Sequence, residues 1–75
     1  MATKREELAK PDSCLNKAGD DEPLFILRGQ DIIAPGKVRE WAGTARASGV
    51  AKNKVDEAMA IADAMDAWHT RKMPD

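Results

Sequence analysis

Gly49 separates two segments that each repeat apolar residues at the spacing of an α-helix. The first, residues 34–48, opens with Ala-Pro-Gly, and proline is tolerated in the first turn of a helix. The second, residues 52–71, has the same periodicity. Because glycine is the residue that most often follows a helix end, the pattern predicts two helices joined by a tight turn, which form an antiparallel hairpin.

The apolar residues of each segment fall on one helical face, because positions i, i+3, i+4 and i+7 lie on the same side of a helix. In the first segment these positions hold Val38, Trp41, Ala42 and Ala45. In the second they hold Val55, Ala58, Ile61, Ala62, Met65 and Trp68. We expect these two faces to form the core and burial of the tryptophans and Phe25 to drive folding.

The preceding half of the chain has weaker signals. Residues 1–12 are charged and predict a flexible N-terminal tail that forms a turn or two of helix at most. One helical turn is expected after Asp12 or Ser13, either of which can cap it. Residues 23–28, Pro-Leu-Phe-Ile-Leu-Arg, fit a short helix capped by Asp21 or a strand.

The expected fold is therefore mainly α. It is one small helical domain over residues 13–75, with a C-terminal antiparallel hairpin and a short helix or strand at 23–28. The strand alternative has no second strand to pair with in this chain, so it requires a partner chain or a symmetric copy.

The length of the chain and its content of cysteine and histidine limit how this domain can be stabilised. A chain of 75 residues buries a modest fraction of its surface. Cys14 is the only cysteine, which excludes an internal disulfide, and with His69 as the only histidine the sequence argues against a structural zinc site. Oligomerisation or a bound partner is the stabilising factor that we expect instead.

The charge and the hydropathy pattern limit the classes of partner that we expect. A net charge of −1 gives no long-range attraction to nucleic acid or to anionic lipid. The longest apolar run, residues 24–27, is far too short to span a membrane, and residues 1–10 have no apolar signal core. We expect a cytoplasmic protein with no membrane partner.

No arrangement of residues predicts catalysis, a metal site or a cofactor. Asp66 lies one helical turn before His69 and can orient it, but no nucleophile accompanies the pair. The acidic residues Asp20, Asp21, Glu22 and Asp31 do not match a calcium-binding loop, and Asp31 is better explained as a turn or cap residue. We therefore expect a protein that is not an enzyme.

One spacing resembles a DNA-binding motif. Ala45, Gly49 and Val55 reproduce the small–glycine–aliphatic pattern of a helix-turn-helix, which would span residues 41–58. The acidic Asp56 and Glu57 and the lack of basic excess argue against DNA binding. Nucleic acid is thus an alternative partner, and a plain helical turn requires the same residues.

Residues 13–75 resemble small uncharacterised proteins of tailed phages and prophages. The matching residues are Ser-Cys-Leu-Asn-Lys-Ala-Gly-Asp-Asp-Glu-Pro-Leu-Phe-Ile-Leu-Arg-Gly-Gln-Asp, then Ala-Pro, Val38, Trp41 and the closing Lys-Met-Pro-Asp. The resemblance implies a phage origin and action inside a bacterium. It assigns no activity to any residue, but short phage proteins of this kind often bind and inhibit a host or defence protein.

The first functional hypothesis is a non-enzymatic interaction protein that binds stoichiometrically to a protein partner, to itself as a homo-oligomer, or to both. The expected binding residues are Arg28, Gln30, Asp31, Arg39 and Lys72. A salt bridge from Arg28 to Asp21 or Glu22 is the structural alternative for that arginine. A further alternative is a module that sequesters a nucleotide, in which Arg28, Lys37 or Lys72 holds a phosphate and a tryptophan stacks on the base.

Overall fold

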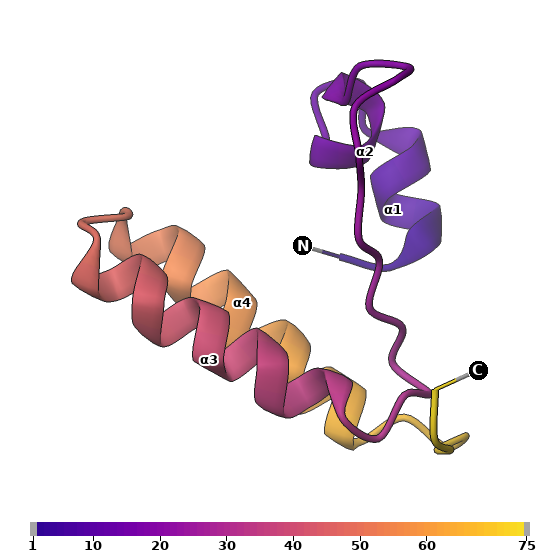
Figure 1. Cartoon of the computed structure of the whole chain (residues 1–75). Helices are drawn as coiled ribbons and strands as arrows, with labels where there is room; N and C mark the ends of the chain where they lie inside the picture. Colours follow the sequence, from indigo (N-terminus) through magenta and orange to yellow (C-terminus); the bar gives the residue numbers. More distant parts are fainter. Residues whose placement is uncertain (1, 75) are drawn as a thin grey trace.

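The computed structural model describes residues 2–74, so Met1 and Asp75 lie outside it. Its helices are α1 (Lys4–Ala9), α2 (Cys14–Lys17), α3 (Ala34–Ala47) and α4 (Lys52–Asp66). The two long helices, α3 and α4, lie side by side and antiparallel (Figure 1). The prediction of a mainly helical fold with a C-terminal hairpin is confirmed.

The turn between α3 and α4 is a Schellman motif. Gly49 has a φ of 85°, in the left-handed region that favours glycine. Its N–H donates to the carbonyl of Arg46 at 3.1 Å, and the N–H of Val50 donates to the carbonyl of Ala45 at 3.0 Å. These two bonds satisfy carbonyls that the end of a helix leaves without partners, so Gly49 ends α3 as the sequence predicted.

The end of α4 differs from the prediction. The helix begins at Lys52 as expected but ends at Asp66, before the predicted end at Arg71. Beyond Ala67 the chain turns, and residues 71–72 bond to residues 29–32. These longer-range contacts replace the last helical turn.

The core of the hairpin is built mainly from alanine. Apart from Pro35 at the start of α3, the buried apolar side chains among the described residues are Ala34, Ala42, Ala45, Val55, Ala58 and Ala62. Val38 and Met59 pack against them and are half-buried. Such small side chains let two helices approach closely.

The large aromatic side chains are not buried as expected. Trp41 is 50% exposed, Trp68 52% and Phe25 89%. Two helices bury only the seam between them, and here alanines fill that seam. The tryptophans therefore lie at its margin, and the prediction that they form the core is wrong for the single chain.

The N-terminal helices form a small unit of their own. Ser13 accepts a hydrogen bond from the N–H of Asn16 at 3.1 Å, which confirms it as the cap of α2. The side-chain amide of Asn16 donates to the carbonyls of Glu7, Leu8 and Lys10, at 2.9, 3.1 and 2.9 Å. This amide ties α2 to the end of α1. The flexibility expected for residues 1–12 stays a prediction.

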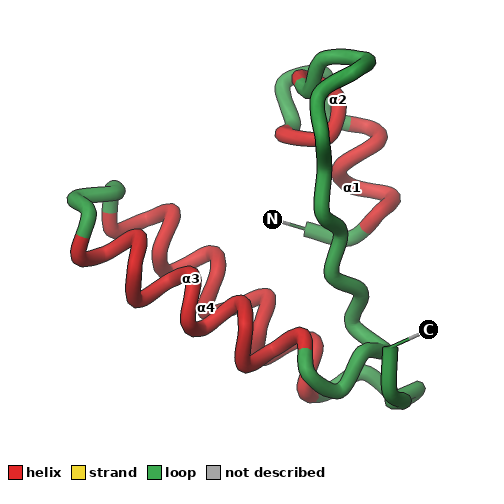
Figure 2. The backbone as a smooth tube through the Cα atoms, viewed as in Figure 1, coloured by secondary structure: helices red, strands yellow, loops and turns green. Residues whose placement is uncertain are grey.

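Residues 22–28 connect this unit to the hairpin as an extended segment, which we call the linker strand (Figure 2). It forms neither the short helix nor the paired strand expected at 23–28, so Asp21 caps no helix. No neighbouring strand is available to it within residues 2–74, and a single helical turn would have no surface on which to bury its apolar side chains.

Candidate functional site

The linker strand enters α3 at the same end of the hairpin where the chain leaves α4 (Figure 1). Main-chain hydrogen bonds join the segment before α3 to the segment after α4. The N–H of Lys72 donates to the carbonyl of Gln30 at 2.7 Å, and the N–H of Ile32 donates to the carbonyl of Lys72 at 2.9 Å. Asp31 and Lys72 thereby form an isolated parallel bridge. Three of the five predicted binding residues, Gln30, Asp31 and Lys72, therefore lie together.

The polar turn before α3 is fixed by Asp31. Its carboxylate Oδ1 accepts from the N–H of Ile33 at 2.9 Å, and its own N–H donates to the carbonyl of Arg28 at 3.0 Å. Both bonds hold the backbone in a turn, which is the common role of aspartate just before a helix. This confirms the prediction of a turn residue.

Arg71 is the residue that sequence analysis missed. Its Nη1 donates to the carbonyl of Gly29 at 2.9 Å and, through a short bond, to that of Met65, while Nη2 donates to that of Ile32 at 3.3 Å. One guanidinium thus joins the end of α4 to the turn before α3. The available signal was a basic residue close behind a helix end, where unpaired carbonyls attract a cation.

The side chain of Trp68 lies close to Gly29, in the same turn before α3. A Cβ atom placed on Gly29 would lie 3.7 Å from Trp68 Cγ and 3.8 Å from Met65 Cγ, so a methyl group there would be in ordinary van der Waals contact with both side chains. The ring of His69 lies 4.5 Å from the Trp68 ring, tilted by 38°. The ring of Trp68 nevertheless stays half exposed.

We call the resulting area the hairpin-end surface. It combines polar groups with exposed apolar side chains and is tied together by Arg71 and the main-chain bridge. Its residues are Gln30, Asp31, Trp68, Lys72 and Met73, of which Met73 is 62% exposed.

Arg39 has a different role. Its Nη2 donates to Asp63 Oδ1 at 2.9 Å and to Asp66 Oδ2 at 2.5 Å. These bonds, first to Asp66 and then to Asp63, raise the pKa of Arg39 above its ordinary value. Arg39 therefore links α3 to α4. Asp66 is engaged with Arg39, and the Asp66–His69 pair that the spacing would allow is not formed.

Arg28, the fifth predicted binding residue, is exposed at the end of the linker strand. It makes no ion pair with any side chain in the described part of the chain. The alternative of a salt bridge to Asp21 or Glu22 in the same chain is therefore not what the structure has. Its guanidinium is available to another molecule.

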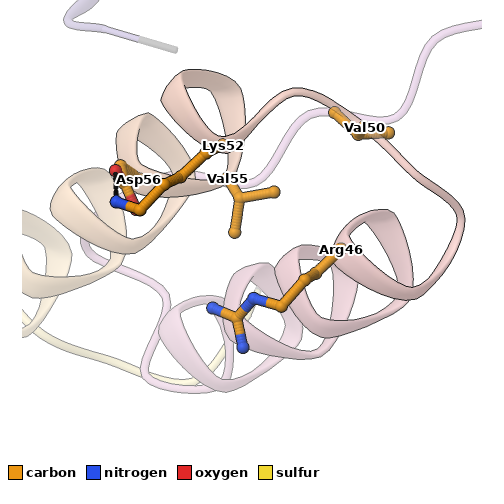
Figure 3. Close-up of a pocket in the computed structure, with 5 residues that line it drawn as sticks. All are labelled: Arg46, Val50, Lys52, Val55 and Asp56. Atoms are coloured by element: carbon orange, nitrogen blue, oxygen red, sulfur yellow. Dashed lines mark hydrogen bonds and ion pairs between the residues drawn. The ribbon is translucent and has the colours of Figure 1, made fainter.

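A pocket at the opposite end of the hairpin is lined by residues of α3, α4 and the turn between them (Figure 3). Lys52 and Asp56 form an ion pair of 2.6 Å beside it, and Val55 lies between α3 and α4. The side-by-side helices differ from a helix-turn-helix, in which the helices cross at about 90–120°. The geometry does not favour residues 41–58 as a DNA-binding unit, and that alternative stays a prediction.

Across residues 2–74, no three histidine, cysteine or acidic side chains gather to hold a metal ion. Over the same residues, no helix has both the length and the apolar character required to cross a membrane.

No protein-family profile matches this sequence, and no curated protein and no solved structure matches it either.

Proposed function

We propose that this chain is a small non-enzymatic interaction protein, which acts by stoichiometric binding to a protein of a bacterial host and inhibits that protein. The binding site in this proposal is the hairpin-end surface. The resemblance of residues 13–75 to small phage proteins supports the bacterial setting.

The observation that carries the proposal is the distribution of apolar side chains. The buried core is mostly alanine, whereas Trp68 and Met73 are more than half exposed. Exposed tryptophan and methionine beside polar groups are the composition that protein interfaces favour. In this chain they lie around the bridge between Asp31 and Lys72.

The rigidity of this surface also supports binding. Arg71 bonds to the carbonyls of Gly29 and Ile32 before α3 and to that of Met65 in α4. A surface held in place before binding loses less conformational entropy when a partner arrives. The half-buried side chain of Gln30 and the exposed side chain of Lys72 would then orient the partner at the rim of the surface.

The test is native mass spectrometry of the tagged protein, purified gently from a bacterial host. We expect a complex with one added protein mass in a fixed ratio. Met73→Asp places a charge in the hairpin-end surface and should remove the added mass. Val50→Asp, at the opposite end of the hairpin, is the matched control and should retain it.

Two results would overturn the proposal. One is a preparation that carries no second protein in any host tested. The other is a second protein whose retention is the same in both aspartate variants, since that protein would be held elsewhere.

A further inference from the structure

The linker strand is the most exposed apolar segment of the described chain. Phe25 is 89% exposed and Ile26 69%. Its main chain is also unpaired: no N–H or C=O group of residues 23–27 makes a hydrogen bond within residues 2–74. An extended, apolar segment with free main-chain groups is a template for pairing with another strand.

We propose that the linker strand pairs antiparallel with the linker strand of a second copy of this chain, about a two-fold axis at Phe25. The proposal goes beyond the proposed function, because it uses a different surface and a different partner. Four arguments from this segment support it.

The first argument is symmetry. Opposed residues of an antiparallel pair alternate between hydrogen-bonded and non-hydrogen-bonded positions. A two-fold axis makes the positions on its two sides equivalent. An axis between two residues would make a hydrogen-bonded position equivalent to a non-hydrogen-bonded one, so the axis must pass through a residue that faces its own copy. The axis can therefore lie at Leu24, Phe25 or Ile26 but not between them.

The second argument is the match of side chains. With the axis at Phe25, Leu24 faces Ile26 of the second copy, and Glu22 faces Arg28. With the axis at Leu24, Glu22 would face Ile26. With the axis at Ile26, Leu24 would face Arg28. Only the axis at Phe25 pairs apolar with apolar and acid with base, and opposite charges across a strand pair are stabilising.

The third argument is Pro23, which has no N–H to donate. With Phe25 at a non-hydrogen-bonded position, Pro23 occupies another one, where the missing N–H would point away from the second strand. Leu24 and Ile26 then exchange four main-chain bonds across the axis. The N–H of Glu22 already donates to the carbonyl of Gly19 at 3.0 Å, so the ladder does not extend to Glu22.

The fourth argument is Arg28 itself. It is exposed and has no ion-pair partner in its own chain within the described residues. A two-fold pair supplies Glu22 of the second copy, and the contact occurs twice. This explains why an acidic and a basic residue flank the apolar run at equal distances from Phe25.

The contact is small. Phe25 would bury about 180 Å² of surface per copy, a usual value for an aromatic side chain. A standard protein interface buries about 800 Å² of surface per partner. We therefore expect a dimer that dissociates on dilution through the micromolar range.

The first experiment is sedimentation velocity from low micromolar to millimolar protein. Wild type should shift from monomer to dimer with rising concentration. Phe25→Asp should raise the dissociation constant at least about tenfold, as expected for loss of a central aromatic contact. Because Phe25 is exposed, this change should leave the helical circular dichroism unaltered. Met73→Asp is the control and should dimerise like wild type.

The second experiment tests the register by charge exchange. Arg28→Glu should weaken the dimer, and the double variant Glu22→Arg with Arg28→Glu should restore it. Asp20→Arg with Arg28→Glu should not restore it. Rescue by the Asp20 pair instead would overturn the axis at Phe25.

The third experiment uses disulfide trapping in a Cys14→Ser background with oxidised glutathione. Directly opposed residues at a non-hydrogen-bonded position have Cα atoms about 4.5 Å apart, which suits a disulfide. Phe25→Cys should cross-link to a dimer faster than Leu24→Cys or Ile26→Cys. Equal rates for the three variants would overturn the register.

The outcomes separate this proposal from the proposed function. A monomer at every concentration would overturn the second-copy proposal. It would do so even if the linker amides became protected from hydrogen exchange on binding a host protein, because that protein and not a second copy would then pair with the linker strand. Phe25→Asp should lose the dimer but keep the host protein, whereas Met73→Asp should do the reverse.

Discussion

Arg71 Nη1 donates a hydrogen bond of 2.9 Å to the carbonyl oxygen of Gly29, across a separation of 42 residues. The same guanidinium bonds to Met65 in the last turn of α4 and to Ile32 in the turn before α3. A charged donor that is half-buried and satisfies several carbonyls acts on the whole end of the hairpin rather than on one helix.

We expect Arg71→Ala to lower the free energy of unfolding by about 1.5–3 kcal/mol, the usual contribution of hydrogen bonds to a charged group. Urea denaturation followed by circular dichroism measures this. Arg46→Ala is the matched control, since Arg46 is exposed on α3 near the opposite end. Equal losses in the two variants would mean that the Arg71 bonds add nothing to stability.

Gly49 and Gly43, two glycines of the hairpin, predict opposite effects of the same substitution. Gly49 has a φ of 85°, where a Cβ costs about 1–2 kcal/mol. Gly43 lies inside α3, and apart from its chain neighbours and the nearby backbone of α3 no atom lies within 4 Å of a Cβ placed there. Alanine at that position should stabilise by about 0.5–1 kcal/mol.

Thermal denaturation should therefore show Gly49→Ala melting below wild type and Gly43→Ala above it. A change of 1 kcal/mol shifts the midpoint of so small a domain by roughly 4–8 °C. A raised midpoint for Gly49→Ala would contradict the left-handed turn.

The alanine seam predicts sensitivity to larger side chains. Ala58 is 0% exposed and lies between α3 and α4. Ala58→Leu should destabilise the hairpin by about 1–3 kcal/mol, because a filled core has no space for the added carbons. Ala47→Leu, at an exposed position of α3, is the control and should change stability little. Urea titrations of both variants that coincide with wild type would show that the seam is loose.

The hairpin was predictable because its signals are local. Helical periodicity, Pro35 in the first turn and Gly49 at the end define α3, and the structure matches them. The cap at Ser13 was predictable for the same reason, because a side-chain oxygen acts on a backbone N–H three residues away.

The features that sequence analysis missed depend on distant contacts. Nothing local shows that α4 ends at Asp66, because the bonds of Arg71 and Lys72 to residues 29–32 replace its last turn. The linker strand was ambiguous because an apolar run of this length fits either helix or strand. Among residues 2–74 it has no neighbouring strand to pair with and no surface on which a helix could pack.

The candidate site was predictable in part. Gln30, Asp31 and Lys72 were expected to bind, and main-chain bonds bring them together. Arg39 was expected in the same role, but its partners are carboxylates of α4. Periodicity identifies the face of a helix on which a residue lies, whereas the pairing of an arginine depends on how two helices are set against each other.

The capping box of α1 predicts a pH dependence. Glu6 Oε1 accepts a hydrogen bond of 2.8 Å from the Thr3 hydroxyl and another of 3.3 Å from the Thr3 N–H. These bonds, the hydroxyl first, lower the pKa of Glu6 below its ordinary value. A carboxyl with a lowered folded pKa stabilises the helix above the unfolded pKa, and this contribution is lost as the pH falls through the folded pKa.

A pH titration of the Glu6 carboxyl by NMR should therefore place its midpoint below the ordinary 4.5, and α1 should lose amide protection below that midpoint. Thr3→Val removes the hydroxyl donor and should raise the midpoint toward the ordinary value. Thr44→Val, on the exposed side of α3, is the matched control and should leave it lowered. A Glu6 midpoint unaffected by Thr3→Val would show that the carboxylate is held by something other than the capping box. Because Glu6 is fully exposed, solvent screening keeps its energetic effect small, so the titration midpoint is the sharper observable.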